Sequence, residues 1–130
     1  MQTPRPKQRS LIWRSDSYKY THDPMYDKEC ENIRSYVEAR LGATHQTVVF
    51  NGLQHMLIEY LQGRVVTMKD VKEAAGLCAI HFGDDTVFNL KGWTRLARVH
   101  KGKLPVTIRA VKEGTVLPVN NAMMTVELTK

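Results

Sequence analysis

The seven-residue segment 16–22 gathers side chains that could do chemistry. It reads Asp-Ser-Tyr-Lys-Tyr-Thr-His and combines a carboxylate, hydroxyls, two phenol rings, an ammonium group and an imidazole. Ser15 or Asp16 can cap a short helix here, because a short side-chain oxygen accepts a backbone N–H one turn further on. Pro24 should limit that helix to one or two turns, since proline disfavours helical geometry at the residue before it. Such a segment suits either a solvated surface helix or a lip that places a ring and a carboxylate over a binding site.

Other kinds of site chemistry have little support in the sequence. It contains no Gly-rich phosphate loop, no His-Glu-x-x-His motif, no Cys/His metal spacing and no obvious nucleophile–base pair. The five histidines do not pair at ligand spacing. Asp84-Asp85, after a predicted helix, fits a cap for the next element better than a metal site. From these patterns we expect no metal-binding residues.

Length and composition fit one domain with a core. The chain has 130 residues, 42% of them hydrophobic, and two cysteines. Cys30 and Cys78 are expected to be reduced thiols in a cytoplasmic protein, with Cys78 a small core residue. No apolar run approaches the ~20 residues that a bilayer span requires. Residues 1–10 do not resemble a secretory signal.

The net charge of +6 favours anionic partners. Its basic residues are spread along the chain, and no known nucleic-acid-binding motif is present. We therefore expect small phosphate-bearing ligands first and nucleic acid a distant second.

The hydrophobic pattern predicts an α+β fold with one early strand, three helices and a C-terminal antiparallel β meander. Residues 1–10 are expected to form a flexible basic tail and 11–130 a single domain. Alternating apolar and polar residues predict a strand over 33–41. The polar face of that strand would carry Arg34, Tyr36, Glu38 and Arg40.

Apolar residues at helical spacing predict the three helices. The first spans 47–61 and contains Gly52, at a cost of about 1 kcal/mol relative to alanine. The second begins at a capping arrangement of Thr67 with the residue three positions on. The third starts near Asn89 and stops at Gly102. The expected buried positions are Val71, Ala75, Cys78 and Phe82 in the second helix, and Leu90, Trp93, Leu96 and Ala97 in the third.

The meander is predicted over the last quarter of the chain. Strands over 106–111, 115–119 and 122–128 would be joined by turns at Glu113-Gly114 and Asn120-Asn121.

Five segments resemble successive landmarks of the nicotinamide phosphoribosyltransferase family. They are DSYKYTH (16–22), SYVEAR (35–40), TVVFNGLQ (47–54), HFGDDTVFNLKGW (81–93) and LPVTIRAVKEGTVLPVNNAMMTVELT (104–129). They occur in the family's order and at nearly its spacing, from about Leu11 to the end. The family is a pentosyltransferase (glycosyltransferase) that joins nicotinamide to phosphoribosyl pyrophosphate, giving nicotinamide mononucleotide and pyrophosphate for NAD salvage. The resemblance implies a homodimer with active sites at the subunit interface.

The resemblance implies substrate-binding roles for three residues and no catalytic residue in this chain. Tyr18 matches a tyrosine that reaches across the dimer and stacks on the nicotinamide ring. Asp16 matches an acid beside that ring, able to accept from the carboxamide N–H or to hold the turn. Arg40 matches an arginine near the phosphate groups, which a guanidinium fork contacts through two oxygens. The alternatives are a packed or solvent-facing Tyr18, a capping Asp16 and an Arg40 paired on the sheet.

The resemblance also implies what this chain lacks. The segment after His22 and the 84–89 turn depart from the family pattern, and the sequence ends where the family continues into an α/β barrel. That barrel holds most contacts to phosphoribosyl pyrophosphate. We expect phosphoribosyl pyrophosphate, Mg and ATP for the full-length enzyme, no cofactor for residues 1–130 alone, and no catalysis by them alone.

Three functions remain open at this point. The first is the N-terminal domain of a nicotinamide phosphoribosyltransferase-like enzyme, completed by the missing C-terminal barrel portion. The alternative is a stand-alone non-catalytic binding or regulatory module derived from that enzyme. The third is a basic nucleic-acid-binding domain, which would show a steep salt dependence of binding. We rank them in that order.

Overall fold

The computed structural model describes residues 10–129 and confirms the α+β class, with helices and antiparallel sheets. Residues 1–9 of the predicted tail lie outside the described part. The chain forms two compact units. The first contains the residues up to Lys28 together with Leu57–Leu104, and the second contains Glu29–Met56 and the chain from Pro105 onward.

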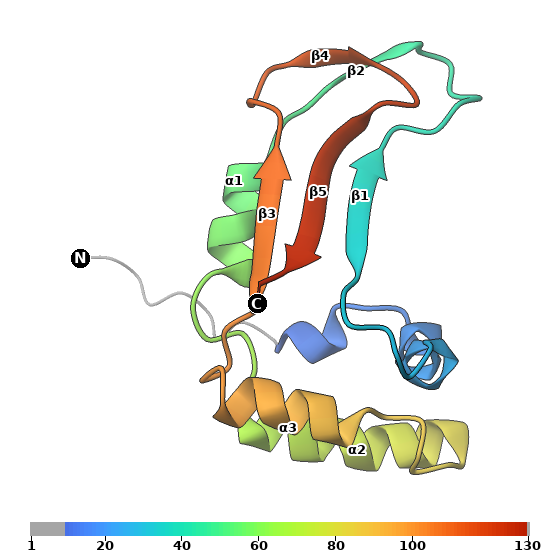
Figure 1. Ribbon diagram of the computed structural model, residues 1–130, viewed down its shortest axis with the longest axis vertical. Helices are drawn as coiled ribbons and strands as arrows, with labels where there is room; N and C mark the ends of the chain where they lie inside the picture. Colours follow the sequence, from blue (N-terminus) through green and yellow to red (C-terminus); the bar gives the residue numbers. More distant parts are fainter. Residues whose placement is uncertain (1–9, 130) are drawn as a thin grey trace. The chain divides into compact units, whose positions relative to one another are not determined.

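The first unit is helical and holds the hydrophobic core. Its elements are the 3₁₀ helices η1 (Leu11–Trp13) and η2 (Ser17–Met25), the π-helical turn η3 (Leu57–Leu61), and the α-helices α2 (Met68–Phe82) and α3 (Leu90–Arg98). Figure 1 shows α2 and α3 side by side. The core residues are Ile12, Val66, Val71, Ala74, Cys78, Phe88 and Ala97. Ser10 is also buried and its Oγ accepts from the Ile12 N–H, so the chain is already packed one residue before η1.

The α2 helix begins where the sequence predicts. The Asp70 carboxylate accepts from the Thr67 N–H at 2.7 Å, and Thr67 Oγ1 accepts from the Asp70 N–H at 3.2 Å. This reciprocal pair is the predicted capping box, and it satisfies two N–H groups that the helix leaves unpaired. Burial of Val71 and Cys78 is confirmed, and Ala74, rather than the predicted Ala75, is the fully buried alanine between them.

The α3 helix also begins as predicted, with Asn89 Oδ1 accepting from the Gly92 N–H at 2.7 Å. It ends at Arg98, before the predicted stop at Gly102. Leu90 was expected to be buried but is 50% exposed, because it lies on the first turn beside the cap. Ala97 is buried as predicted.

The predicted limit on the N-terminal helix is wrong. Pro24 lies inside η2, which continues to Met25. The reason is that η2 is a 3₁₀ helix, which tightens the turn and avoids the i−4 carbonyl that a proline ring strikes in an α-helix.

The second unit contains two small antiparallel sheets and one helical turn. The strands are β1 (Arg34–Glu38), β2 (Thr47–Val49), β3 (Val106–Ala110), β4 (Val116–Pro118) and β5 (Ala122–Leu128), and the turn is α1 (Leu53–Met56). The larger sheet has the order β1-β5-β3, and β2 pairs with β4 (Figure 1). The three predicted C-terminal strands are therefore present. The predicted meander is wrong, because β4 pairs with β2 and not with its sequence neighbours β3 and β5.

The predicted helix over 47–61 is wrong in its first part. Its first three residues form β2, where Val48 lies opposite Leu117 of β4. β-Branched residues lose side-chain freedom in a helix and pack well on a strand, so an available partner strand decides the outcome. Gly52 has φ +93° and precedes the helix rather than lying inside it. Helical structure starts at Leu53 and continues through η3.

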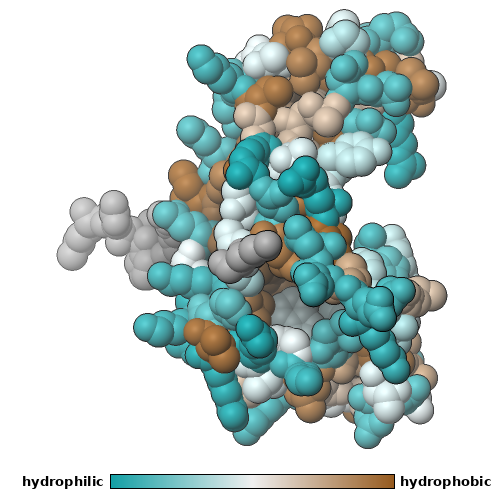
Figure 2. Space-filling model, in the orientation of Figure 1, coloured by the Kyte–Doolittle hydropathy of each residue, from teal (hydrophilic) through white to brown (hydrophobic). Residues whose placement is uncertain are grey.

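The larger sheet has one polar and one apolar face. Opposite residues of an antiparallel pair point to the same side, and the register joins Arg34 with Glu127 and Ile108 with Val126. On the apolar face Val37 is 43% exposed, and among the described residues of this unit only Val119 is buried. Figure 2 shows hydrophobic side chains gathered over the β2–β4 ribbon, where Val49 and Val116 are each 62% exposed.

Candidate functional site

The first candidate feature is the exposed face of η2, which displays Tyr18. The Tyr18 side chain is 56% exposed, with the ammonium group of Lys19 5.1 Å and the ring of His22 5.7 Å from its ring centre. Both neighbours lie on η2 itself. The ring is therefore solvent-facing, which is one of the alternatives that the sequence left open, and it remains accessible to another flat ring.

Tyr20, two residues along, anchors the same helix. Its hydroxyl donates to the Ile12 carbonyl, and its ring lies 6.0 Å from that of Phe88. Burial, with a smaller contribution from nearby Cys78, raises the pKa of the Tyr20 phenol, so it remains a neutral donor. The Asn89 amide donates to the Asp23 carboxylate at 2.6 Å and ties the far end of η2 to the start of α3. The helix that carries Tyr18 is thus fixed at two points.

Asp16 occupies the N-cap position of η2, but its side chain makes no capping hydrogen bond. Its backbone carbonyl accepts from the Lys19 N–H at 3.0 Å instead. The side-chain capping that the sequence suggested for Ser15 or Asp16 is therefore not the arrangement formed. Asp16 is exposed and lies two residues before Tyr18, at the start of η2.

Arg40 lies in the second unit, in the loop after β1 rather than on the strand where the sequence placed it. The strand stops at Glu38 because the pairing with β5 becomes irregular between Val37 and Glu38. The Arg40 side chain is exposed and makes no hydrogen bond or ion pair with any residue in the described range 10–129.

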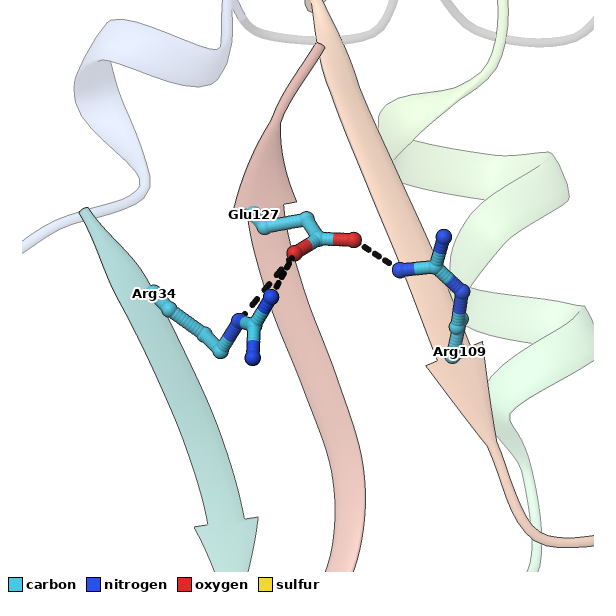
Figure 3. A network of polar contacts seen from close by, with 3 residues as sticks. All are labelled: Arg34, Arg109 and Glu127. Atoms are coloured by element: carbon cyan, nitrogen blue, oxygen red, sulfur yellow. Dashed lines mark hydrogen bonds and ion pairs between the residues drawn. The ribbon is translucent and has the colours of Figure 1, made fainter. Parts of the chain in front are cut away.

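The ion pairs of the larger sheet involve other arginines. Figure 3 shows Glu127 on the central strand between Arg34 and Arg109 on the two edge strands. Arg34 Nη2 lies 2.7 Å from Glu127 Oε2, and Arg109 contacts the other carboxylate oxygen. Both arginine side chains are about two-thirds exposed, at 69% and 66%, so the network adds little stability. The sequence shows the alternation but not this pairing, because Arg34 and Glu127 are 93 positions apart.

A cavity of about 540 Å³ lies in the first unit between the segment Leu11–Tyr26 and the start of α3. We call it the η2–α3 cavity. Its lining includes three basic residues, three aromatic rings and one carboxylate. These are Arg14, Lys19, His22, Tyr20, Tyr26, Trp93 and Asp23. The sequence did not predict this cavity, because its two walls are more than 60 positions apart. The only sequence signal for it was the mixture of rings and cations in segment 16–22, which forms part of one wall.

A second cavity of about 420 Å³ lies against the C-terminal half of α2 and is lined in part by Trp13, Phe82 and Cys78. Burial raises the pKa of the Cys78 thiol, which favours the neutral form over the nucleophilic thiolate. The expected role of Cys78 as a core residue is confirmed by its 4% exposure, and both cysteines are free thiols.

The described residues show neither a metal-binding cluster nor a membrane-spanning helix. Within residues 10–129 no group of three or more His, Cys, Asp or Glu side chains could hold a metal ion. In the same range no helix is both long and apolar enough to cross a membrane.

Comparison with known proteins assigns the family. The sequence model for "Nicotinamide phosphoribosyltransferase, N-terminal domain" matches residues 10–108. A protein of Xanthomonas campestris pv. campestris (strain 8004), named nicotinamide phosphoribosyltransferase, is 41% identical over 120 residues, which are 92% of this chain and 25% of that protein. The chain therefore belongs to the nicotinamide phosphoribosyltransferase family, within its N-terminal domain. It spans about a quarter of the length of this curated relative.

Proposed function

We propose that this chain acts as the N-terminal domain of a nicotinamide phosphoribosyltransferase-like enzyme of NAD salvage. The enzyme would convert nicotinamide and phosphoribosyl pyrophosphate to nicotinamide mononucleotide and pyrophosphate. The observation that carries the proposal is the family match over residues 10–108, which includes the exposed Tyr18 of η2. Dimerisation is part of the same proposal, because the role of Tyr18 depends on a partner subunit.

In this proposal Tyr18 reaches across the dimer and stacks on the nicotinamide ring that is bound in the partner subunit's active site. An electron-poor pyridine stacked on a phenol ring gains about 1 kcal/mol beyond the burial of its area. The exposure of Tyr18 supports this role, as does the anchoring of its helix by Tyr20. Asp16 would accept a hydrogen bond from the carboxamide N–H, for which its lack of a capping bond leaves it available.

Arg40 would contact the phosphate groups of phosphoribosyl pyrophosphate. Its planar guanidinium can donate to two phosphate oxygens at once. The backbone next to it is held, because the Asn120 N–H donates to the Ala39 carbonyl at 2.7 Å. A fixed backbone that carries an unpaired, exposed cation is a suitable support for phosphate binding.

The chemical step would need groups from the remainder of the enzyme. As pyrophosphate leaves the anomeric carbon and the pyridine nitrogen bonds to it, positive charge develops on the sugar and must be stabilised in place. The proposal assigns Mg and ATP to the rest of the enzyme, as the family resemblance implies. This chain would orient the nicotinamide ring and contact the phosphate groups.

The exposed apolar face of the β1-β5-β3 sheet supports the proposal that another part of the enzyme supplies the catalytic groups. Sheets that are apolar on one face normally pack that face against other structure. In this unit the face remains half-exposed, with Val37 at 43% and Leu128 at 46%. We propose that the remaining part of the enzyme covers it.

The test uses a chimaera in which this chain replaces the matching 120 residues of the Xanthomonas relative. Tyr18→Ala should raise KM for nicotinamide about two- to tenfold, and Tyr18→Phe should leave it nearly unchanged, because the ring is retained. An unchanged KM in Tyr18→Ala would rule out the stacking role.

Arg40 is tested in the same chimaera. Arg40→Gln should raise KM for phosphoribosyl pyrophosphate about tenfold, since a charge-assisted contact is lost. Arg34→Gln removes another exposed arginine from the same unit and is the control, for which no such rise is expected. Equal effects of the two variants would contradict a specific role for Arg40.

A further inference from the structure

We propose that the η2–α3 cavity binds a small molecule that carries both an aromatic ring and a phosphate group. The volume of about 540 Å³ is within the range of small-molecule sites, which are mostly apolar with a few placed polar groups. The proposal concerns binding to the first unit alone, and it holds or fails independently of the proposed enzymatic function.

The aromatic part of the lining is arranged before any ligand arrives. Trp93 lies parallel to Phe88, with an interplanar angle of 5° and ring centres 6.3 Å apart. Tyr20 is fixed by its hydrogen bond to Ile12. Tyr26, 49% exposed, belongs to the same lining. Fixed aromatic walls favour a flat ligand, because stacking on them costs little ordering of the protein.

The charged part of the lining is positive. Arg14, Lys19 and His22 contribute basic groups, and Asp23 is the one acid among the described lining residues. The Asp23 carboxylate already accepts a hydrogen bond from the neutral Asn89 amide at 2.6 Å, and its single negative charge is outnumbered by those of Arg14 and Lys19. An anionic group would therefore be attracted to this cavity, whereas a cationic ligand would not.

Arg14 is held in a way that leaves it able to bind an anion. Its guanidinium lies 4.3 Å from the centre of the Tyr60 ring. A ring face attracts the guanidinium plane without using the N–H groups at its edge, so these remain available for phosphate oxygens. Lys19 is likewise 5.1 Å from the centre of the Tyr18 ring.

Binding would be communicated to Tyr18. Lys19 and His22 line the cavity and are also the two neighbours of the Tyr18 ring on η2. A phosphate that draws Lys19 toward the cavity changes the surroundings of that ring. The ring resonances of Tyr18 therefore report occupancy from outside the cavity.

The first experiment is calorimetric titration of the 130-residue chain with adenosine 5′-monophosphate as the probe. Adenosine, which lacks the phosphate, and inorganic phosphate, which lacks the ring, are the two controls. We expect the monophosphate to bind at least about tenfold more tightly than either control, because only it uses both parts of the lining. Shifts of the Trp93 and Tyr18 resonances should accompany binding. Equal affinity for the monophosphate and either control overturns the proposal.

Variants separate the cavity from general charge attraction. Lys19→Gln and Arg14→Gln should each weaken binding of the monophosphate about three- to tenfold, while binding of adenosine changes little. Tyr26→Ala should weaken binding of both adenosine compounds. Lys72→Gln, on the exposed face of α2 and outside the lining, removes the same charge and should have almost no effect. A loss in Lys72→Gln as large as that in Lys19→Gln overturns the proposal.

Discussion

Tyr18 and Tyr20 lie on the same short helix but differ in burial and in their contacts. Tyr20 is half-buried, donates to the Ile12 carbonyl and packs near Phe88, and it thereby fixes η2 to the core. Tyr18 is 56% exposed and contacts neighbours on its own helix. The sequence predicted an aromatic-bearing polar helix but could not say which tyrosine was the anchor, because that depends on tertiary contacts with Ile12 and with the distant Phe88.

Removing each hydroxyl tests this difference. Tyr20→Phe should lower the free energy of unfolding by about 1 kcal/mol, because the Ile12 carbonyl loses its donor in a partly buried setting. Tyr18→Phe is the matched control and should change it by no more than about 0.5 kcal/mol. Urea unfolding followed by circular dichroism measures both. Equal effects would contradict the anchoring role of Tyr20.

At the scale of elements, long-range contacts determine where several helices begin and end. The Glu113 carboxylate accepts from the Gly52 N–H at 2.7 Å and the Gln54 N–H at 3.1 Å, and so caps α1 from about 60 positions away. The Gly102 N–H donates to the Leu96 carbonyl, and the Val65 N–H donates to the Gly102 carbonyl, each at 2.9 Å. Gly102 therefore joins the end of α3 to the segment before α2.

The hydrogen bonds to Glu113 predict a pH dependence of stability. Donation from Gln54 and Gly52 lowers the pKa of the Glu113 carboxyl below its ordinary value of 4.5. Well above pH 4.5 the carboxylate is ionised in both states, and its full contribution to stability is present. As the pH falls below 4.5, the unfolded chain takes up the proton first, so stability decreases until the folded-state pKa has been passed.

Carbon-detected NMR titration should therefore give Glu113 a pKa below 4.5, and Glu113→Gln should remove its part of the acid-dependent loss. Such a variant should also be less stable than the parent at pH 7. A Glu113 pKa at or above 4.5 would contradict the cap.

Two glycines with similar backbone angles make a matched test of close packing. Gly102 has φ +74°, and a Cβ there would lie 2.2 Å from the Val66 carbonyl oxygen. Gly83 has φ +67°, but a Cβ there would meet open space. Gly83→Ala should cost about 1–2 kcal/mol from the left-handed backbone alone. Gly102→Ala should cost at least about 2 kcal/mol more, because backbone must also move. Equal losses in thermal unfolding would show that the close approach is unimportant.

The sequence predicted elements best where the determining residues are local. The capping arrangement at Thr67 involves residues three positions apart and is confirmed, as is the predicted start of the third helix near Asn89. The helix expected at 47–49 is instead β2, because its partner Val116–Pro118 lies about 70 residues further on. Arg40 was placed on a strand for a similar reason, since alternation alone does not show where pairing with β5 becomes irregular.

At the scale of the whole molecule, the two units differ in how much of their own packing they contain. The described core residues belong to the first unit except for Val119, while the larger sheet of the second unit keeps half-exposed apolar positions. This contrast fits a chain that spans about a quarter of its Xanthomonas relative. The candidate site residues Tyr18, Asp16 and Arg40 were predicted from family motifs, because their types and spacing alone did not identify a site.

The most direct test of the central proposal measures formation of nicotinamide mononucleotide from nicotinamide and phosphoribosyl pyrophosphate, with Mg and ATP present. The samples are the purified chain and the chimaera with the Xanthomonas relative, its folding checked by circular dichroism and sedimentation. We predict no product from the chain alone and clear turnover by the chimaera. Product formed by the chain alone would contradict the proposal that another part of the enzyme supplies the catalytic groups. A folded, dimeric chimaera without activity would contradict the proposed function itself and favour a stand-alone binding module.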